Sequence, residues 1–364
     1  TNTTSIDSYF LANAQGLRLD EISAFEGETI SEAYGEIGAY YGYPNQQAFL
    51  GYESYILEPD MDTDDNTSYF SNIAPGNFNQ EFSYAATGYN GKFTVNGAMQ
   101  FDDNIYLGIN LNSHFINYNR STYLYESNTN DSSLVTQVGF ENNLYTEGNG
   151  FSFQLGGIAK LNDSFRIGVV YDSPVWYTIN EETTQYLSTV RDDNGSNVNT
   201  TLNPNVVNVF PEYKLQTPSK VTGSAAIILS SKGLISFDYS RKDYGNAKLK
   251  PTSDQYFASQ NTLISNNLKA TNSYRIGGEL KHKQLSFRGG YKFEESPFTE
   301  SDFYGDLTGY SLGIGYNFGS SKLDLAYETS ERKTSYQLID VGLTDAARID
   351  RKNSNFVLTL SFNL

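Results

Sequence analysis

The side chains best placed to bind a ligand are cations that recur on one face of strand-like segments. Arg166, Arg275, Arg288 and Lys292 stand at alternate positions, and Ser286 adds a hydroxyl to the same face. A carboxylate that enters a low-dielectric interior needs a charge-assisted partner of this kind. Arg288 is the best candidate because it lies in the middle of its segment. Acidic residues share these faces, so ion pairs across the wall are the competing interpretation: Asp238, Glu279, Glu294, Asp324 and Glu328.

Catalytic chemistry finds little support. The chain has no cysteine and two histidines, His114 and His282. His282 lies between two lysines in a predicted turn. His114 has Ser113 beside it, but neighbouring residues of a strand point to opposite faces and cannot pair directly. We expect no enzyme activity and no cofactor.

One acidic stretch has part of the spacing of a calcium loop. Asp60, Asp62 and Asp64 alternate, but Asp65 stands where that loop needs glycine, and Ser71 stands where it needs an acid. A solvated acidic loop fits better, and we expect no metal site.

Composition narrows the class of protein further. The 364 residues include 25 Lys and Arg against 42 Asp and Glu, a net charge of −17 that makes nucleic acid an unfavourable partner. The mean hydropathy of −0.48, with no apolar run of about 18 to 20 residues, excludes a helical membrane protein. An aromatic share of 15% in so polar a chain indicates β-structure with rings at an interface.

The elements that would position these side chains are strands with apolar residues at every second position. We count eleven such segments, and the connections between them alternate between short and long, as in outer-membrane barrels. The segments are 79–101, 104–119, 150–161, 164–178, 216–230, 233–244, 272–281, 284–295, 307–318, 321–336 and 352–364. The long connections are 120–149, 179–215, 245–271, 296–306 and 337–351.

The two faces of these segments differ in the sense expected of a transmembrane barrel. Leu285, Phe287, Tyr291 and Phe293 alternate with polar or charged residues. Alternation alone also fits a soluble sandwich. Segments of ten or more residues match a tilted membrane crossing, and tyrosines near their ends match aromatic girdles. Pro174, inside a segment, predicts a bulge or kink near the rim.

Residues 1–57 follow a helical period instead. Apolar residues recur at three- and four-residue spacing around Ala33 and Tyr34 and again around Phe49 and Tyr52, with Pro44 between the two helices. A further helix is expected near residues 5–11. This aromatic-rich part predicts a helical lid whose groove residues would be Tyr34, Tyr41, Phe49 and Tyr52.

Short phrases of the sequence resemble the outer-membrane long-chain fatty acid transporter (FadL) family, in the form common among Bacteroidetes. Their order and spacing cover roughly residues 79–364. The phrases are Gly150–Leu161 (GFSFQLGGIAKL), Phe165–Pro174 (FRIGVVYDSP), Thr217–Lys220 (TPSK), Gly233–Tyr239 (GLISFDY), Tyr274–Glu279 (YRIGGE), Phe287–Tyr291 (FRGGY) and Glu295–Pro297 (ESP).

The resemblance implies a fourteen-stranded, antiparallel up-and-down β-barrel with an N-terminal hatch, of which about eleven strands are visible here. We therefore expect an N-terminally truncated chain, with residues 1–78 as an extracellular helical lid and residues 79–364 as transmembrane strands. The phrase Asn-Pro-Ala of the family's hatch does not occur in the sequence.

The resemblance also implies passive transport of hydrophobic compounds, fatty acids or hydrocarbons, across the bacterial outer membrane, with membrane lipid around the barrel. Two alternatives stay open. A barrel of this type could serve as an adaptor or shuttle for a secreted protein, which would need a loop surface for that partner. A porin for polar solutes would instead have a wide hydrated lumen.

Overall fold

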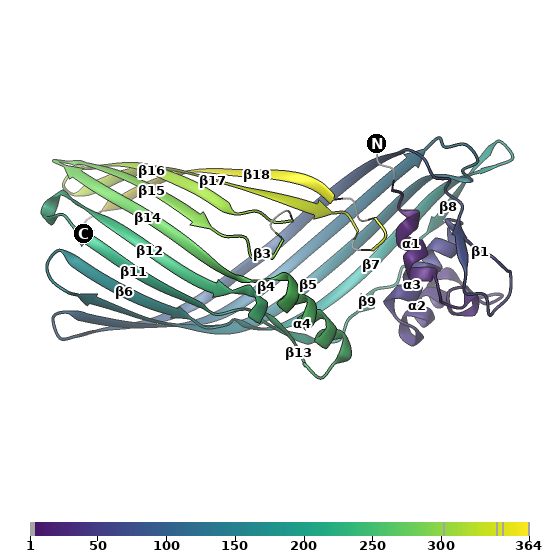
Figure 1. Ribbon diagram of the computed structural model, residues 1–364, viewed down its shortest axis with the longest axis horizontal. Coiled ribbons are helices and arrows are strands. Elements are labelled where there is room, and N and C mark those ends of the chain that lie inside the picture. Colours follow the sequence, from purple (N-terminus) through teal and green to yellow (C-terminus); the bar gives the residue numbers. More distant parts are fainter. Residues whose placement is uncertain (1–3, 301–302, 340, 344–345, 363–364) are drawn as a thin grey trace.

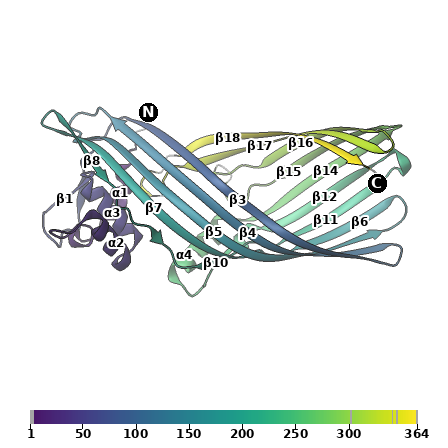
Figure 2. The same ribbon diagram turned by 180° about the vertical axis from the view of Figure 1, so that it is seen from behind.

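The computed structural model describes residues 4–300, 303–339, 341–343 and 346–362. Most of them form one antiparallel sheet of sixteen strands (Figures 1 and 2). The strands are β3 (Phe78–Phe101), β4 (Ile105–Asn128), β5 (Val135–Lys160), β6 (Phe165–Asp172), β7 (Trp176–Asp193), β8 (Ser196–Leu202), β9 (Asn208–Val209), β10 (Tyr213–Gln216), β11 (Lys220–Ile228), β12 (Gly233–Asp243), β13 (Lys248–Lys250), β14 (Ala270–His282), β15 (Leu285–Glu294), β16 (Leu307–Asn317), β17 (Ser321–Gln337) and β18 (Ala346–Phe362).

The sixteen strands lie along eleven lines, which confirms the predicted number of strand segments. β6 and β7 follow one another along β5, with the break at residues 173–175, where Pro174 removes a backbone donor. In the same way β11 and β10 form one line, and so do β12 and β13. The short strands β8 and β9 are added beside β7.

Two of the predicted long loops are wrong. Residues 120–149 are mostly strand, because β4 continues to Asn128 and β5 begins at Val135. Residues 179–215 hold the rest of β7 with β8, β9 and part of β10. At about 3.4 Å per residue, a 24-residue strand spans roughly 80 Å, far more than a membrane crossing needs. We call the parts of β3, β4, β5 and β7 beyond this crossing the extension; Figure 1 shows them passing the ends of the other strands.

Helix α4 (Gln255–Asn267) is a second departure, because residues 245–271 were expected to be a plain loop. Its sequence has only a weak apolar period, with Phe257 and Ile264 seven residues apart on one face. The signal that was present is its N-cap, since the side chain of Asp254 accepts a hydrogen bond from the backbone N–H of Phe257 at 3.0 Å.

The apolar face of the sheet points outward. Phe287, Tyr291, Leu312 and Ile314 are all exposed on this face. Ring pairs between neighbouring strands mark one border of the apolar band: Phe151 and Trp176, Tyr239 and Tyr274, and Tyr310 and Tyr327. None of the helices in the described ranges has both the length and the apolar character needed to cross a bilayer.

The two end strands of the sheet are β3 and β18, which pair within the described residues only with β4 and β17. The sheet is nevertheless strongly curved, because Phe82 of β3 contacts Tyr336 of β17 with 5.7 Å between their ring centroids. Strands at opposite ends of the sheet therefore meet across its inner side.

The predicted N-terminal helices are confirmed as α1 (Asp7–Ala14), α2 (Ile30–Tyr40) and α3 (Tyr43–Glu53). Thr29 and Glu32 form a capping box at the start of α2, and Pro44 lies in the first turn of α3, where its missing N–H costs nothing. A small sheet of β1 (Leu57–Pro59) and β2 (Tyr69–Ser71) completes this helical unit, residues 4–77. Short 3-10 helices occur at Leu19–Glu21, Ser230–Lys232 and Tyr244–Asn246.

The helical unit packs against the inner face of the extension, as Figures 1 and 2 show. Phe10 of α1 and Phe49 of α3 are fully buried, and the ring of Phe10 lies 5.4 Å from that of Phe140 on β5. Leu124 and Leu187 extend this core along β4 and β7. Burial of each such side chain stabilises by about 1.5 to 3 kcal/mol, which holds the unit on the sheet.

A buried carboxylate anchors the start of α1. Glu126 of β4 accepts hydrogen bonds from the hydroxyl of Ser5 (2.5 Å), the backbone N–H of Ile6 (3.0 Å) and the side-chain amide of Gln80 (2.6 Å). Burial raises the pKa of the Glu126 carboxyl, and the three donors offset part of that rise. Burial also raises the pKa of Glu53 at the end of α3.

These shifts predict that docking of the helical unit depends on pH. A carboxyl whose pKa is higher in the docked state contributes its full stability below its ordinary pKa, about 4.3, and loses it as pH rises through the raised value. Proteolysis of the helical unit should therefore speed up as the pH rises above about 4.3 and through the raised pKa values. Glu126→Gln should flatten part of this rise, and Glu53→Gln should flatten the rest. The matched control is Glu36→Gln, an exposed position on α2; an unchanged profile in Glu126→Gln would contradict the assignment.

Candidate functional site on the inner wall

Three ion pairs cross the inner wall from β15 to β17. Arg288 pairs with Asp324 at 2.6 Å, Lys292 pairs with Glu328, and Glu294 pairs with Arg332 at 3.0 Å. Each pair spans the intervening strand β16. Arg288 also reaches Glu279 of β14 at 3.2 Å, so this cation has two acidic partners.

Glycines of β16 make room for these long side chains. A Cβ at Gly315 would clash with Oδ1 of Asp324, and one at Gly309 would lie 2.7 Å from Cε of Lys292. A Cβ at Gly313 would lie 3.5 Å from Cβ of Arg288. The bare strand lets both cations lie flat along the wall. At their exposure, each pair stabilises by about 1 kcal/mol or less, so the pairs orient charge more than they hold the fold.

The predicted ligand cations fall into two groups. Arg288 and Lys292 form ion pairs across the wall. The sequence analysis gave such pairs as the alternative to ligand binding. Ser286 is buried on the same strand. Arg166 is exposed near the 161–164 turn, and Arg275 is exposed on β14. Within the described part of the chain, neither Arg166 nor Arg275 forms an ion pair or a side-chain hydrogen bond.

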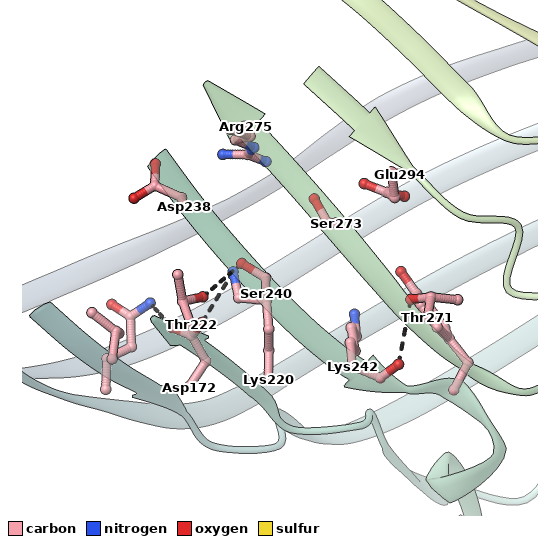
Figure 3. Close-up of a pocket in the computed structure, with 13 residues that line it drawn as sticks. Asp172, Lys220, Thr222, Asp238, Ser240, Lys242, Thr271, Ser273, Arg275 and Glu294 are labelled. Atoms are coloured by element: carbon pink, nitrogen blue, oxygen red, sulfur yellow. Dashed lines mark hydrogen bonds and ion pairs between the residues drawn. The ribbon is translucent and has the colours of Figure 1, made fainter. Parts of the chain in front are cut away.

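Arg275 lines two neighbouring cavities of the wall, of about 470 and 540 Å3. In the second it stands with Arg288 and Lys292. Figure 3 shows the first, where Arg275 and Asp238 lie close together on adjacent strands. That cavity carries three acidic and three basic side chains, together with hydroxyl groups: Asp172, Asp238, Glu294, Lys220, Lys242, Arg275, Thr222, Ser240, Thr271 and Ser273.

The lining is therefore polar and balanced in charge. Lys220 is paired with Asp172 at 3.0 Å, and Lys242 lies over the ring of Tyr244. Arg275 is flanked in register by Asp238 on β12 and Lys292 on β15. Such a wall can bind a polar or charged head group. Of its cations in the described ranges, Lys242 contacts only a ring, and Arg275 has neither an ion pair nor a side-chain hydrogen bond.

The predicted groove residues of the helical unit are placed differently from one another. Tyr34 and Phe49 are buried in its core, Tyr52 is half-buried against that core, and Tyr41 is exposed at the end of α2. The hydroxyl of Tyr34 donates to Gln185 at 2.7 Å, and burial raises its pKa. A groove role for these four residues stays a prediction.

The side chain of His114 pairs with a residue of the neighbouring strand and not with Ser113, which the sequence analysis excludes as a direct partner. Nε2 of His114 on β4 lies 2.8 Å from the hydroxyl of Ser152 on the neighbouring strand β5, and both side chains are on the inner face. Ser113 points to the other face. Asn112 donates to the same hydroxyl at 3.2 Å. In the residues that the structure describes, no acid bonds the second ring nitrogen of His114, so the pair lacks the orienting member of a hydrolytic triad.

The sequence reasoning missed two inner-wall residues. Arg120 on β4 and Thr183 on β7 each carry a buried side-chain atom, Nε and Oγ1, without a hydrogen-bond partner in the described structure. Nε of Arg332 is a third such atom, but its guanidinium bonds Glu294 and Tyr304. Both missed residues lie in connections that the sequence had assigned to loops.

An antiparallel sheet with an outward apolar band, aromatic rings at the border and a charged inner wall is typical of a β-sheet protein of the outer membrane. The family described as outer membrane protein transport protein (OMPP1/FadL/TodX) matches residues 90–364, and the chain belongs to it. Membership places the chain in the outer membrane, among transporters of hydrophobic compounds and not among enzymes.

Solved structures of similar proteins include the toluene transporter TbuX of Ralstonia pickettii, with 12% identity, 84% of this chain and 76% of that chain covered, and a TM-score of 0.44. A FadL homologue of Pseudomonas aeruginosa is 11% identical, with 74% of this chain and 77% of that chain covered and a TM-score of 0.42. The toluene transporter TodX of P. putida is 13% identical, with 80% of this chain and 91% of that chain covered and a TM-score of 0.40. No curated protein sequence matches the chain. The TM-scores are low, and the assignment depends on the family model.

The glycines of β16 predict that adding a side chain at a crowded position of this strand lowers the stability of the protein. Gly315→Ala should displace Asp324 from Arg288 and lower the free energy of unfolding by about 1 to 3 kcal/mol, as overpacking does. The measurement is the thermal midpoint in detergent, followed by the gel shift between folded and unfolded protein. Gly223→Ala is the matched control, because nothing lies within 4 Å of a Cβ there. Equal midpoints for the two variants would show that β16 tolerates side chains.

Proposed function

We propose that the chain carries long-chain fatty acids, or amphipathic molecules like them, across the outer membrane by passive diffusion. The observation that carries the proposal is Arg275, a cation on the wall of two cavities with no bonded partner in the described ranges. A carboxylate leaving water needs such a charge-assisted donor. Arg288 and Lys292 supply positive charge nearby but are already paired.

The substrate class follows from the lining. A neutral hydrocarbon would gain nothing from three acids, three bases and five hydroxyl groups, and displacing their water would cost free energy. A fatty acid can place its head group against this wall and its tail in the lumen. Aromatic hydrocarbons are the alternative substrate, and they would need an apolar path elsewhere.

We assign residues 1–78 to an extracellular lid and residues 79–364 to the transmembrane part with its extension. The helical unit lies at the end of the sheet opposite the tight turns (Figure 1), and short turns face the periplasm in barrels of this kind. In this arrangement Tyr41 faces the exterior, while Tyr34, Phe49 and Tyr52 fix the lid on the extension.

Arg275→Gln tests the head-group site. Loss of a hydrogen bond to a charged group costs about 1.5 to 3 kcal/mol, so the variant should bind oleate about tenfold to a hundredfold more weakly. Titration calorimetry of the whole chain in detergent measures the affinity. Oleyl alcohol has the same tail without the charge, and its affinity should not change.

Arg241→Gln is the matched control, since it removes the same charge from the outward-facing positions of β12. A loss of oleate affinity equal to that of Arg275→Gln would point to net charge and not to a site. Tight binding of toluene with no binding of oleate by the unmodified chain would favour the hydrocarbon alternative.

A further inference from the structure

The outer face of the extension is a polar surface without cations. It consists of every second residue of 117–125 on β4, of 141–149 on β5 and of 178–188 on β7. These sixteen positions hold five asparagines, four tyrosines, three glutamates and four serines or threonines, and none of them is buried. The helical unit packs against the opposite face and leaves this one uncovered (Figures 1 and 2).

This surface begins directly beyond the apolar band. Phe151 and Trp176 stand opposite one another at the border of the band, and Asn149 and Thr178 form the next row of the same face. The outer leaflet of a bacterial outer membrane consists of glycolipids, whose sugars extend beyond the head groups. With three carboxylates and no cation, the surface repels phosphate groups, but its amides, hydroxyls and rings can contact uncharged sugars.

The centre of the surface is a carboxylate between two tyrosines. Glu141 stands opposite Tyr123 on β4 and opposite Tyr186 on β7. Neighbouring strands lie about 4.8 Å apart, so the two tyrosines are about 10 Å apart. A Cβ at Gly139 would lie 2.5 Å from the hydroxyl of Tyr123, so this ring lies along the sheet. Asn143 donates to Oε1 of Glu141 at 2.9 Å, while Oε2 has no hydrogen bond within the described residues.

A second group of the same kind lies nearer the membrane. The hydroxyl of Tyr145 accepts a hydrogen bond from the amide of Asn117 at 2.8 Å and donates one to Oε2 of Glu147 at 3.2 Å. Asn119 and Glu182 stand opposite Tyr145 on its two sides. A sugar ring has an apolar C–H face and neighbouring hydroxyl groups. Flat tyrosine rings match that face, and carboxylates beside amides match the hydroxyls.

We propose that the outer face of the extension, centred on Glu141 between Tyr123 and Tyr186, binds the uncharged sugar chains of outer-leaflet glycolipids. The inference rests on the exterior position assigned to the extension under the proposed function, and it is independent of the transported substrate. Each contact is shallow, so a single sugar is bound weakly. A repeating chain that engages both tyrosine groups gains affinity because its second contact forms within the same complex.

The test uses the full chain in detergent. The probe is an uncharged polysaccharide released by mild acid from smooth lipopolysaccharide, and biolayer interferometry measures its affinity. Glu141→Gln should weaken binding about tenfold, Tyr123→Ala should weaken it about threefold to tenfold, and Tyr123→Phe should have little effect because the ring remains. The matched controls are Glu36→Gln and Tyr40→Ala, both at exposed positions of α2, and they should bind like the unmodified chain.

Three outcomes would overturn the inference. The first is that the unmodified chain does not bind the polysaccharide, or that Glu141→Gln binds it as well as Glu36→Gln does. The second is an affinity that falls steeply with salt, because salt screens contacts between charges; a cationic protein would then be the better partner. The third is a dimer of the chain that Tyr123→Ala dissociates, which would make this face an interface between two copies.

Oleate binding keeps this inference apart from the proposed function. Glu141→Gln should bind oleate like the unmodified chain, because Glu141 lies on the outer face and not in the lumen. A chain that binds the polysaccharide but no oleate would lose the proposed substrate and keep the sugar surface. A chain that binds oleate but no polysaccharide would keep the substrate and lose the sugar surface.

Discussion

Backbone hydrogen bonding is the constraint on which the rest of the structure depends. A chain that crosses hydrocarbon must satisfy every backbone N–H and C=O within the protein. Continuous antiparallel ladders do so here for the strands between β3 and β18, while the outer edges of these two end strands pair with no strand in the described residues. Because side chains then alternate strictly between faces, each residue of a crossing strand is assigned to lipid or to lumen by its position alone. The breaks at residues 173–175 and 217–219 fall at Pro174 and Pro218, near the end of the apolar band, where water can supply the missing partners.

The same alternation explains how much could be predicted. The crossing strands were found within a few residues, since Phe287 and Tyr291 must face lipid while Arg288 and Lys292 must not. The extension was missed because its outer face meets water: Tyr123 and Glu141 there do not give the apolar signal that a lipid-facing strand requires. α4 was missed for a related reason, because a mostly exposed helix has only a weak apolar period.

The candidate site was predictable as a face but not as a set of contacts. Sequence position assigns Arg288, Lys292 and Arg275 to one wall, yet their different roles depend on which acids lie two strands away. Arg288 reaches Asp324 only because Gly315 and Gly313 leave β16 bare between them. Arg275 has no such track to an acid. The glycines, which carry no charge themselves, thus decide which cation keeps hydrogen-bonding capacity for a ligand.

The difference between paired and unpaired cations also decides how charge is distributed along the lumen. Paired cations add little net field, since each positive charge is balanced within a few ångströms. Arg275 is an exception on the described inner wall, because it lines two cavities and has no ion pair or side-chain hydrogen bond there. An anion in the lumen would be bound where hydrogen-bond donors are unmet rather than where cations are most numerous. For passive transport this matters, because binding must be strong enough to draw the head group out of water and weak enough to release it again.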